Sequence, residues 1–148
     1  MNELEAALRI SLGNTFTMYF KAHSYHWNVE GMFFSQYHDF FSDLYEELFD
    51  SVDTYAEQLR ALDVYAPISI AALYDNKTVE EDIEKPDDIT GMLENLQTAN
   101  NQVIETLNKL FDLATNANEQ GLADFAAGRI DVHKKHGWML RASLKKVK

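Results

Sequence analysis

The amino-acid sequence predicts an all-α fold, a four-helix bundle with one long crossover between the second and third helices. Four long segments carry apolar residues at three- and four-residue spacings. The segment between the second and third of them is too long for a tight hairpin. With only six glycines and two prolines among 148 residues, the composition disfavours a turn-rich β-sandwich.

The first periodic segment predicts a helix over residues 3–29. Its apolar and aromatic positions are Leu4, Leu8, Leu12, Phe16, Tyr19, His23 and Trp27. Asn28 and Gly31 supply the stop signal. Because the turn around residues 30–32 is short, the next helix is expected to be an antiparallel neighbour. That second helix ends near Asp63 and carries Phe41, Leu44, Leu48, Val52, Ala56, Leu59 and Leu62.

The crossover extends over residues 64–86. Residues 68–74 are expected to form a short helix within it, and residues 75–85 an acidic loop. The second helix is roughly 45 Å long at about 1.5 Å per residue, and extended crossover residues at about 3.3 Å each cover that distance. The second and third helices can therefore run parallel.

The third helix is expected to begin after Pro86, with Asp87 and Asp88 as candidate N-terminal caps. It continues through Ile89, Leu93, Leu96, Val103, Leu107, Leu110 and Ala114. The fourth helix starts near Glu119 and contains Phe125, Ile130, His133, Leu140 and Leu144.

Two glycines, Gly128 and Gly137, lie inside the fourth predicted helix. Each costs about 1 kcal/mol relative to alanine in a helix interior. Close approach of a neighbouring helix would explain both of them.

Composition narrows the class of protein. A chain with 46% hydrophobic and 25% charged residues is expected to form a single domain over residues 1–148. The absence of cysteine excludes disulfides, thiolate zinc sites and cysteine nucleophiles. The N-terminus lacks a basic region followed by an apolar core, and no apolar run reaches the length of a membrane span. A cytoplasmic location is therefore expected.

The charge distribution is acidic overall and basic at the C-terminus. The net charge of −11 favours cations, including metal ions, over nucleic acid. Seven of the thirteen Lys and Arg residues nevertheless lie between Arg129 and Lys148. These cations can complement the dipole of the last helix. The alternative is a phosphate-binding tail formed by Lys145, Lys146 and Lys148.

Two histidines and two carboxylates form a candidate metal site. His26 lies just before the predicted turn and His38 just after it, so the two side chains can converge. Asp53 and Glu57 are four residues apart and therefore share one face of the second helix. Imidazole nitrogens and carboxylate oxygens suit Fe(II) and leave open positions for oxygen or peroxide.

The spacing along the second helix decides how these four residues can meet. His38 and Asp53 are separated by about 22 Å at 1.5 Å per residue, whereas metal–ligand bonds are about 2 Å long. Either the two pairs are unrelated features, or two chains meet with antiparallel second helices. In the second case the histidines of one protomer face the carboxylates of its partner, and a two-fold axis creates two identical sites.

The motifs around these residues resemble those of the Dps (mini-ferritin) family of ferritin-like proteins. The pattern H-W-N-x-x-G is found at residues 26–31, a second histidine follows twelve residues after the first, and D-x-x-x-E-x-x-x-x-L is found at residues 53–62. The segment 133–142 is similar to the family's terminal-helix signature. The resemblance covers nearly the whole chain, most strongly residues 22–62.

The resemblance implies an iron-binding and iron-storing homo-oligomer. It implies that His26, His38, Asp53 and Glu57 are ligands of an inter-subunit ferroxidase site, and that twelve subunits form a hollow, dodecameric cage holding ferric mineral. The alternative is a shell of the same fold that coats DNA or serves as a scaffold, with weak or degraded iron chemistry. The missing basic N-terminal extension argues against DNA coating.

One position departs from the family pattern. The family commonly has an acidic residue four positions after the second histidine, where this chain has Ser42. Asp43 lies about 100° further around the helix, and Glu46 is on the correct face but another turn along. The first iron position therefore keeps its candidate ligands, and the second lacks its acid.

A diiron centre inside a single bundle is disfavoured. Such centres need E-x-x-H motifs on two helices and a glutamate on each of the others. The second and fourth predicted helices contain no E-x-x-H, and the first has no glutamate between Glu5 and Glu30.

The remaining aromatic, histidine and acidic residues receive structural roles or open alternatives. His23 is assigned to structure, and His133 and His136 are expected to pack or to face solvent. Trp27 either packs in the core or borders the iron site. The core and dimer interface are expected to include Tyr37, Phe40, Phe41, Tyr45 and Phe49. An acidic pore of a cage, or ordinary solvated helix faces, would account for Asp124 and Asp131.

Overall fold

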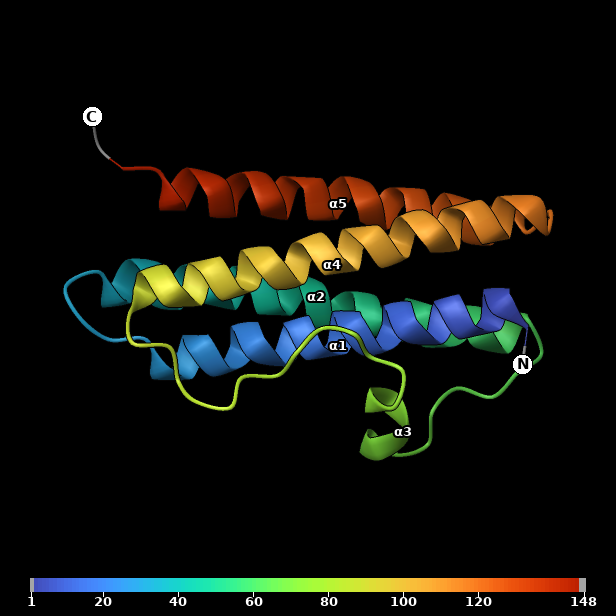
Figure 1. Cartoon of the computed structure of the whole chain (residues 1–148), viewed down its shortest axis with the longest axis horizontal. Coiled ribbons are helices and arrows are strands. Elements are labelled where there is room, and N and C mark those ends of the chain that lie inside the picture. Colours follow the sequence, from blue (N-terminus) through green and yellow to red (C-terminus); the bar gives the residue numbers. More distant parts are fainter. Residues whose placement is uncertain (1, 147–148) are drawn as a thin grey trace.

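A computed structural model describes residues 2–146 of the chain, and its regular structure there is entirely helical (Figure 1). The predicted all-α fold is confirmed. The helices are α1 (Glu3–Asn28), α2 (Phe34–Ala61), α3 (Ile70–Tyr74), α4 (Ile89–Asn116) and α5 (Gln120–Leu144).

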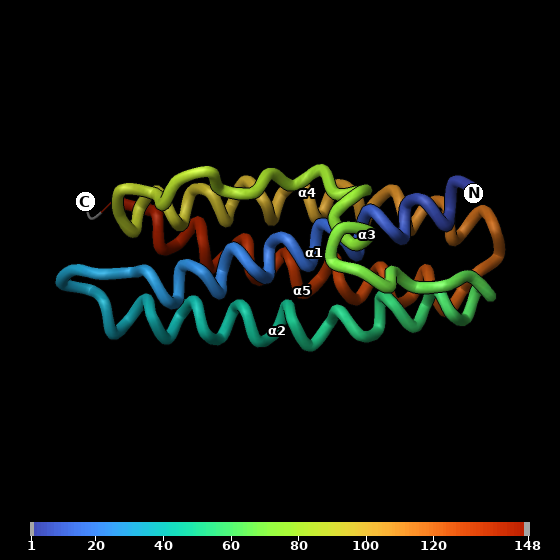
Figure 2. The backbone as a smooth tube through the Cα atoms, turned by 90° about the horizontal axis from the view of Figure 1, so that it is seen from below, coloured from blue at the N-terminus to red at the C-terminus, as the bar shows by residue number. Residues whose placement is uncertain are grey.

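The four long helices form a bundle with the predicted topology. α1 and α2 are antiparallel, the crossover carries the chain back along the bundle, and α4 then runs parallel to α2 (Figure 1). α5 returns antiparallel to α4. Figure 2, turned by 90°, shows the crossover and α3 running along the outside of the bundle beside α1 and α4. The long connection is therefore what makes α2 and α4 parallel.

The core is made by the apolar stripes of the four long helices. Within residues 2–146, α1 packs closely against α2 and α4, and α4 against α5. Fully buried side chains from every long helix include Leu8, Leu12, Phe41, Leu48, Leu96, Leu107 and Leu140. None of the helices in this described part of the chain has both the length and the apolar character needed to cross a membrane.

Side-chain caps set several helix ends. Of the two predicted capping aspartates, Asp88 is the one that accepts a hydrogen bond, from the Gly91 amide at 2.9 Å. Ser69 caps α3 by accepting from the Ala72 amide at 3.0 Å, so α3 begins at Ile70 rather than at residue 68. Gly31, with φ of +111°, supplies the left-handed backbone of the α1–α2 turn.

Two polar side chains hold the crossover against the bundle. The Asn14 Oδ1 accepts from the main-chain amides of Thr78 (2.7 Å) and Val79 (3.0 Å). Asp82 accepts from the Tyr25 hydroxyl at 2.5 Å and pairs with Lys21 at 3.0 Å. The acidic loop predicted at residues 75–85 is therefore attached to α1 through the carboxylate of Asp82.

The explanation offered for the α5 glycines is correct at one position and wrong at the other. A Cβ on Gly137 would lie 3.1 Å from Asn100 Nδ2 of α4, so this glycine permits a close approach. A Cβ on Gly128 would meet nothing within 4 Å. Helix packing in the protomer therefore does not explain Gly128.

Candidate metal site

The two candidate histidine ligands lie on either side of the α1–α2 turn, as predicted. His26 Nδ1 is 2.8 Å from the His38 carbonyl oxygen, and His38 Nδ1 is 2.7 Å from the His26 carbonyl oxygen. Because a carbonyl oxygen can only accept, each Nδ1 carries the proton and donates. Each Nε2 of a neutral ring therefore keeps its lone pair, which is the form in which imidazole binds a metal.

The same contacts fix the position of both rings. The imidazoles of His26 and His38 are stacked, with centroids 3.7 Å apart and planes 18° from parallel. The ring of Phe34 stacks on His38 with a centroid distance of 4.9 Å. Reciprocal hydrogen bonding and stacking therefore hold the two candidate ligands together in a fixed arrangement.

The candidate carboxylates lie on an exposed face of α2. Asp53 and Glu57 are both exposed and one turn apart. A hydrogen bond that protonated Glu57 can donate to Asp53, then the negative charge of Asp53, and then desolvation raise the pKa of Glu57. These two carboxylates compete for one proton. A divalent cation between them would replace the proton and remove the repulsion between their negative charges.

The structure does not bring the two pairs together within one protomer. Among residues 2–146 of a single chain, no three His, Asp or Glu side chains are placed to hold a metal ion. His26 lies with His38, and Asp53 with Glu57, and the pairs remain about 22 Å apart along α2 at 1.5 Å per residue. Each pair therefore contains two of the four candidate ligands.

The surroundings of Ser42 show what stands where the family has its acid. The Ser42 hydroxyl donates to Glu46 Oε1 at 3.4 Å, so Glu46 approaches this position from one turn along. Asp43 instead lines a groove between α2 and α5. Asp43 is therefore no substitute, as the helical angle predicted.

Aromatic residues surround the ring of His23, whose centroid lies 6.0 Å from that of His26. Trp27 is 58% exposed in the protomer, so the alternative that it packs in the core is wrong. His23 lies between Trp27 and Tyr45, with ring centroids 4.2 Å and 3.8 Å away. The Tyr19 hydroxyl is 2.8 Å from His23 Nδ1. His23 is thus hydrogen bonded within the protomer, in agreement with its structural assignment.

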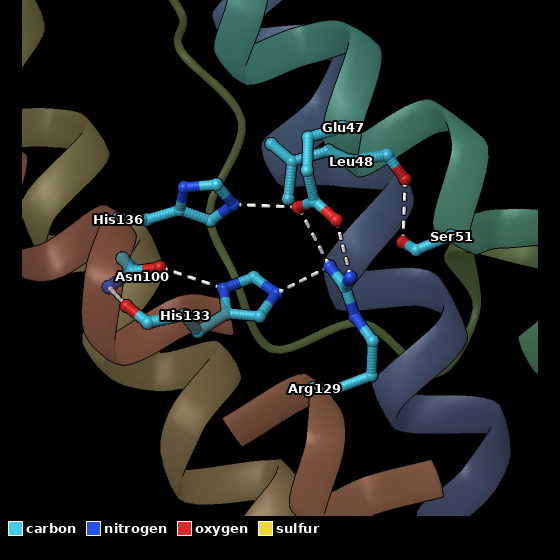
Figure 3. Close-up of polar contacts among 7 residues, drawn as sticks. All are labelled: Glu47, Leu48, Ser51, Asn100, Arg129, His133 and His136. Atoms are coloured by element: carbon cyan, nitrogen blue, oxygen red, sulfur yellow. Dashed lines mark hydrogen bonds and ion pairs between the residues drawn. The ribbon is translucent and has the colours of Figure 1, made fainter. Parts of the chain in front are cut away.

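A second group of polar residues, which the sequence analysis did not predict, lies between α2, α4 and α5 (Figure 3). We call it the Glu47 cluster, and it consists of Glu47, Asn100, Arg129, His133 and His136. Arg129 donates to both carboxylate oxygens of Glu47, at 2.5 and 3.1 Å. His136 Nε2 donates to Glu47 Oε1 at 2.6 Å. Burial raises the pKa of Glu47, but the hydrogen bonds and charges of His136 and Arg129 outweigh it and hold the pKa at about 2.

His133 occupies the buried centre of the cluster. Asn100 Nδ2 donates to the His133 carbonyl at 2.9 Å, which leaves Asn100 Oδ1 to accept from His133 Nδ1 at 2.8 Å. His133 Nε2 then accepts from Arg129 at 3.1 Å, so the ring is neutral (Figure 3). Burial and the nearby charge of Arg129 hold its pKa well below the usual value.

His133 and His136 were expected to pack or to face solvent, and the structure shows that both pack; their partners were not predicted. Arg129, His133 and His136 follow one another at spacings of four and three, so they share one face of α5. That shared polar face within an apolar stripe was the available signal. Nothing in the sequence pointed to Glu47, 82 residues before Arg129.

The acidic residues considered for a pore are both exposed. Asp131 lines the groove between α2 and α5, which has a volume of about 500 Å³, together with Asp43 and Lys135. Asp124 lies at an exposed position in the first half of α5. A pore needs several copies of the chain, so this alternative stays a prediction.

Comparison with known proteins places these features in context. Residues 5–148 match the family model of the ferritin-like domain. An uncharacterised low-temperature-induced protein of Nostoc sp. is 31% identical over 136 residues, covering 91% of this chain and 76% of that protein. The DNA protection during starvation protein 2 of Bacillus anthracis is 28% identical over 127 residues, covering 86% of each chain. The X-ray structure of Dps from Thermosynechococcus elongatus has a TM-score of 0.94 at 25% identity, covering 99% of this chain and 92% of that one.

Proposed function

Because the chain belongs to the Dps family of the ferritin-like superfamily, we propose that it is a ferroxidase that also stores iron. It binds Fe(II) as substrate between two subunits, oxidises it with peroxide or oxygen, and stores the ferric product in a cage. The observation that supports this best is the reciprocal hydrogen bonding of His26 and His38, which presents two unprotonated Nε2 atoms. We place this activity in the cytoplasm.

The site is proposed to form at a two-fold axis. His26 and His38 of one protomer would face the partner's Asp53 and the partner's Glu57, giving four ligands of the type that Fe(II) prefers. Two nitrogen and two carboxylate ligands leave positions open for the oxidant. The raised pKa of Glu57 supports a cation between the carboxylates, since a metal ion replaces the proton that the pair would otherwise hold.

The proposed assembly is a dodecamer. A closed cage would hold the ferric product in its interior. The net charge of −11 on each chain would attract iron cations to the cage. The native mass in solution, measured with and without Fe(II), tests the assembly. A protein that stays monomeric in both conditions would refute the two-chain site.

Iron oxidation is tested by anaerobic Fe(II) titration followed by addition of peroxide. The variants His38→Ala and Asp53→Ala are each expected to lose tight Fe(II) binding and fast oxidation, because each removes a ligand from every site. The matched control is Asp112→Ala, which removes an exposed carboxylate from the surface of another long helix, α4. Unchanged oxidation in both ligand variants would remove the proposed site.

Mixing the two inactive variants tests the inter-subunit arrangement. When His38→Ala and Asp53→Ala chains are unfolded, mixed and reassembled, each mixed dimer contains one site with all four ligands. Random pairing therefore restores about a quarter of the sites. No recovery of activity in correctly assembled mixtures would refute the inter-subunit site.

A DNA-coating shell is the second candidate. It is supported by the name of the relative from Bacillus anthracis, a DNA protection during starvation protein, and by the lysines near the C-terminus, including Lys145 and Lys146. A gel-shift assay at low salt tests it. A shift that disappears when residues 145–148 are removed would favour this candidate, because phosphate contacts supply most non-specific affinity.

A further inference from the structure

A tyrosine and a histidine of α1 form a hydrogen-bonded pair next to the candidate metal site. The Tyr19 hydroxyl lies 2.8 Å from His23 Nδ1. Burial, and then the neighbouring Tyr45, raise the pKa of Tyr19, so its phenol keeps its proton. The protonated phenol therefore donates to His23 Nδ1, which can accept the proton if the phenol is oxidised.

An unbroken aromatic path joins this pair to His26. The Tyr45 ring lies 5.2 Å from the His26 ring and 6.1 Å from the Tyr19 ring, between centroids. Tyr45 also stacks on His23, with a centroid distance of 3.8 Å and planes 7° from parallel. Each step between rings is short enough for an electron to pass, so Tyr19 is electronically connected to the candidate ligand.

The number of electrons needed to reduce peroxide at the candidate metal site indicates a role for this aromatic path. Reduction of hydrogen peroxide to two hydroxide ions takes two electrons, and one Fe(II) supplies one. Ser42 stands where the family has the acid of the second iron position, and its hydroxyl is used in a hydrogen bond to Glu46. A site with ligands for one Fe(II) needs another electron source if it is not to release a hydroxyl radical.

We propose that Tyr19 and His23 form a proton-coupled electron donor that supplies this second electron through Tyr45. The proposal rests on the iron oxidation proposed above. When peroxide is reduced, Fe(II) gives one electron and becomes Fe(III), and the Tyr19 phenol gives the other. The phenolic proton moves to His23 Nδ1 and leaves a neutral tyrosyl radical. The next Fe(II) returns an electron to Tyr19 while His23 returns the proton, so two Fe(II) and one peroxide become two Fe(III) and two hydroxide ions.

The first test follows the radical during iron oxidation. Peroxide is added to the Fe(II)-loaded protein, and samples frozen after milliseconds are examined by electron paramagnetic resonance. We expect a tyrosyl radical in the natural protein, its loss in Tyr19→Phe, and an increase of spin-trapped hydroxyl radical in that variant. His23→Gln, which removes the proton acceptor, is expected to slow radical formation. Tyr37→Phe is the matched control, because Tyr37 is next to His38 in sequence but contacts the aromatic rings of Phe40 and Phe41 rather than an imidazole.

The second test needs no iron. Azide radicals generated by pulse radiolysis oxidise the metal-free protein, and the absorbance of tryptophanyl and tyrosyl radicals is followed with time. Arrival of the radical at Tyr19, with a slower step in heavy water and none in Tyr19→Phe, supports the pair. A radical that remains on Trp27, or spreads over other tyrosines in equal amounts, overturns it.

The two tests separate failure of this inference from failure of the proposed function. If Fe(II) oxidation depends on His38 and Asp53 but Tyr19→Phe changes neither the radical nor the trapped hydroxyl radical, the electron donor is refuted and the ferroxidase stands. If no iron is oxidised by the natural protein, the ferroxidase is refuted. The metal-free experiment then still decides whether Tyr19 and His23 act as a redox pair.

Discussion

Two pairs of histidines in this protein use their ring nitrogens in opposite ways. In the pair at the α1–α2 turn, His26 and His38 each donate from Nδ1 to a main-chain carbonyl, and among residues 2–146 no hydrogen bond is made by either Nε2. In the Glu47 cluster, His133 uses both nitrogens, toward Asn100 and Arg129. The first pair therefore keeps two ring nitrogens that could bind a metal, whereas both ring nitrogens of His133 are already hydrogen bonded.

The difference shows that hydrogen-bond saturation, and not residue type, separates a candidate ligand from a structural histidine. Both pairs lie on long helices and contain rings close together. In the Glu47 cluster, however, the Arg129 guanidinium fills the position between Glu47 and His133 that a cation would need. The same residue types thus give stability in one region and proposed reactivity in the other.

The largest expected effect comes from removing the cation of the Glu47 cluster. Arg129→Met should lower the free energy of unfolding by about 2–3 kcal/mol, because it leaves Glu47 and His133 without their shared donor. The partial exposure of Glu47 keeps the loss below that of a fully buried pair. Chemical unfolding at fixed protein concentration measures it. Lys134→Met, at an exposed position of the same helix, should change stability by less than about 0.5 kcal/mol.

A histidine-to-glutamine substitution in each region should separate the structural role from the proposed metal-binding role. His133→Gln should cost about 2 kcal/mol by leaving buried partners unsatisfied, with Fe(II) affinity unchanged. His26→Gln should change stability by less than about 1 kcal/mol and weaken Fe(II) binding at least about 10-fold. Calorimetric titration under anaerobic conditions, beside unfolding curves, measures both quantities. Equal losses of affinity in the two variants would contradict the comparison.

The contribution of the Glu47 cluster to the stability of the fold should depend on pH in the acid range. The pKa of Glu47 is lowered from 4.5 to about 2 in the folded state. A lowered pKa means that this carboxylate stabilises the folded state above pH 4.5 and loses that contribution as the pH falls toward 2. The melting temperature of Glu47→Gln should therefore lie below that of the natural protein at pH 6 and approach it near pH 2. A constant difference between the two proteins across this range would show that the ionised carboxylate is not the stabilising group.

The smallest effect on stability, and a selective effect on iron, is expected at Ser42. Ser42→Asp restores an acid four positions after His38 and should raise the number of Fe(II) bound at each site. The free energy of unfolding should change by less than about 0.5 kcal/mol, because the position is near the surface. Gln36→Asp adds the same charge at an exposed position of α2 and should leave the Fe(II) stoichiometry unchanged.

The sequence predicted the helices and their topology because these depend on local and periodic signals. Spacing of apolar residues placed α1, α2, α4 and α5, and the capping candidates Asp87 and Asp88 placed the start of α4, which the structure shows to be capped by Asp88. The meeting of His26 and His38 also followed from a short turn. The four-residue site itself stays a prediction, since its completion depends on a second chain.

The features that escaped prediction depend on contacts between residues far apart in sequence. The pairing of Glu47 with Arg129 and His136 joins two helices that are adjacent only in the folded bundle. Gly128 was expected to allow close packing and does not, because no helix within residues 2–146 of the protomer comes near it. Trp27 continued the periodic stripe of α1, yet it lies on the exposed side, because the buried face at this end of the helix runs through Ala22, Tyr25 and Val29 instead.

The fastening of the crossover to α1 bears on the order in which the chain folds. The α1–α2 and α4–α5 hairpins close through short turns, so each can form from contacts near in sequence. The hydrogen bonds of Asn14 with Thr78 and of Tyr25 with Asp82 instead span 64 and 57 residues, and closing such long loops costs entropy before any contact stabilises them. We expect the hairpins to form first and the crossover to attach last. Amide hydrogens of Thr78 and Val79 should then exchange with solvent long before those in the middle of α1, through opening of the crossover alone.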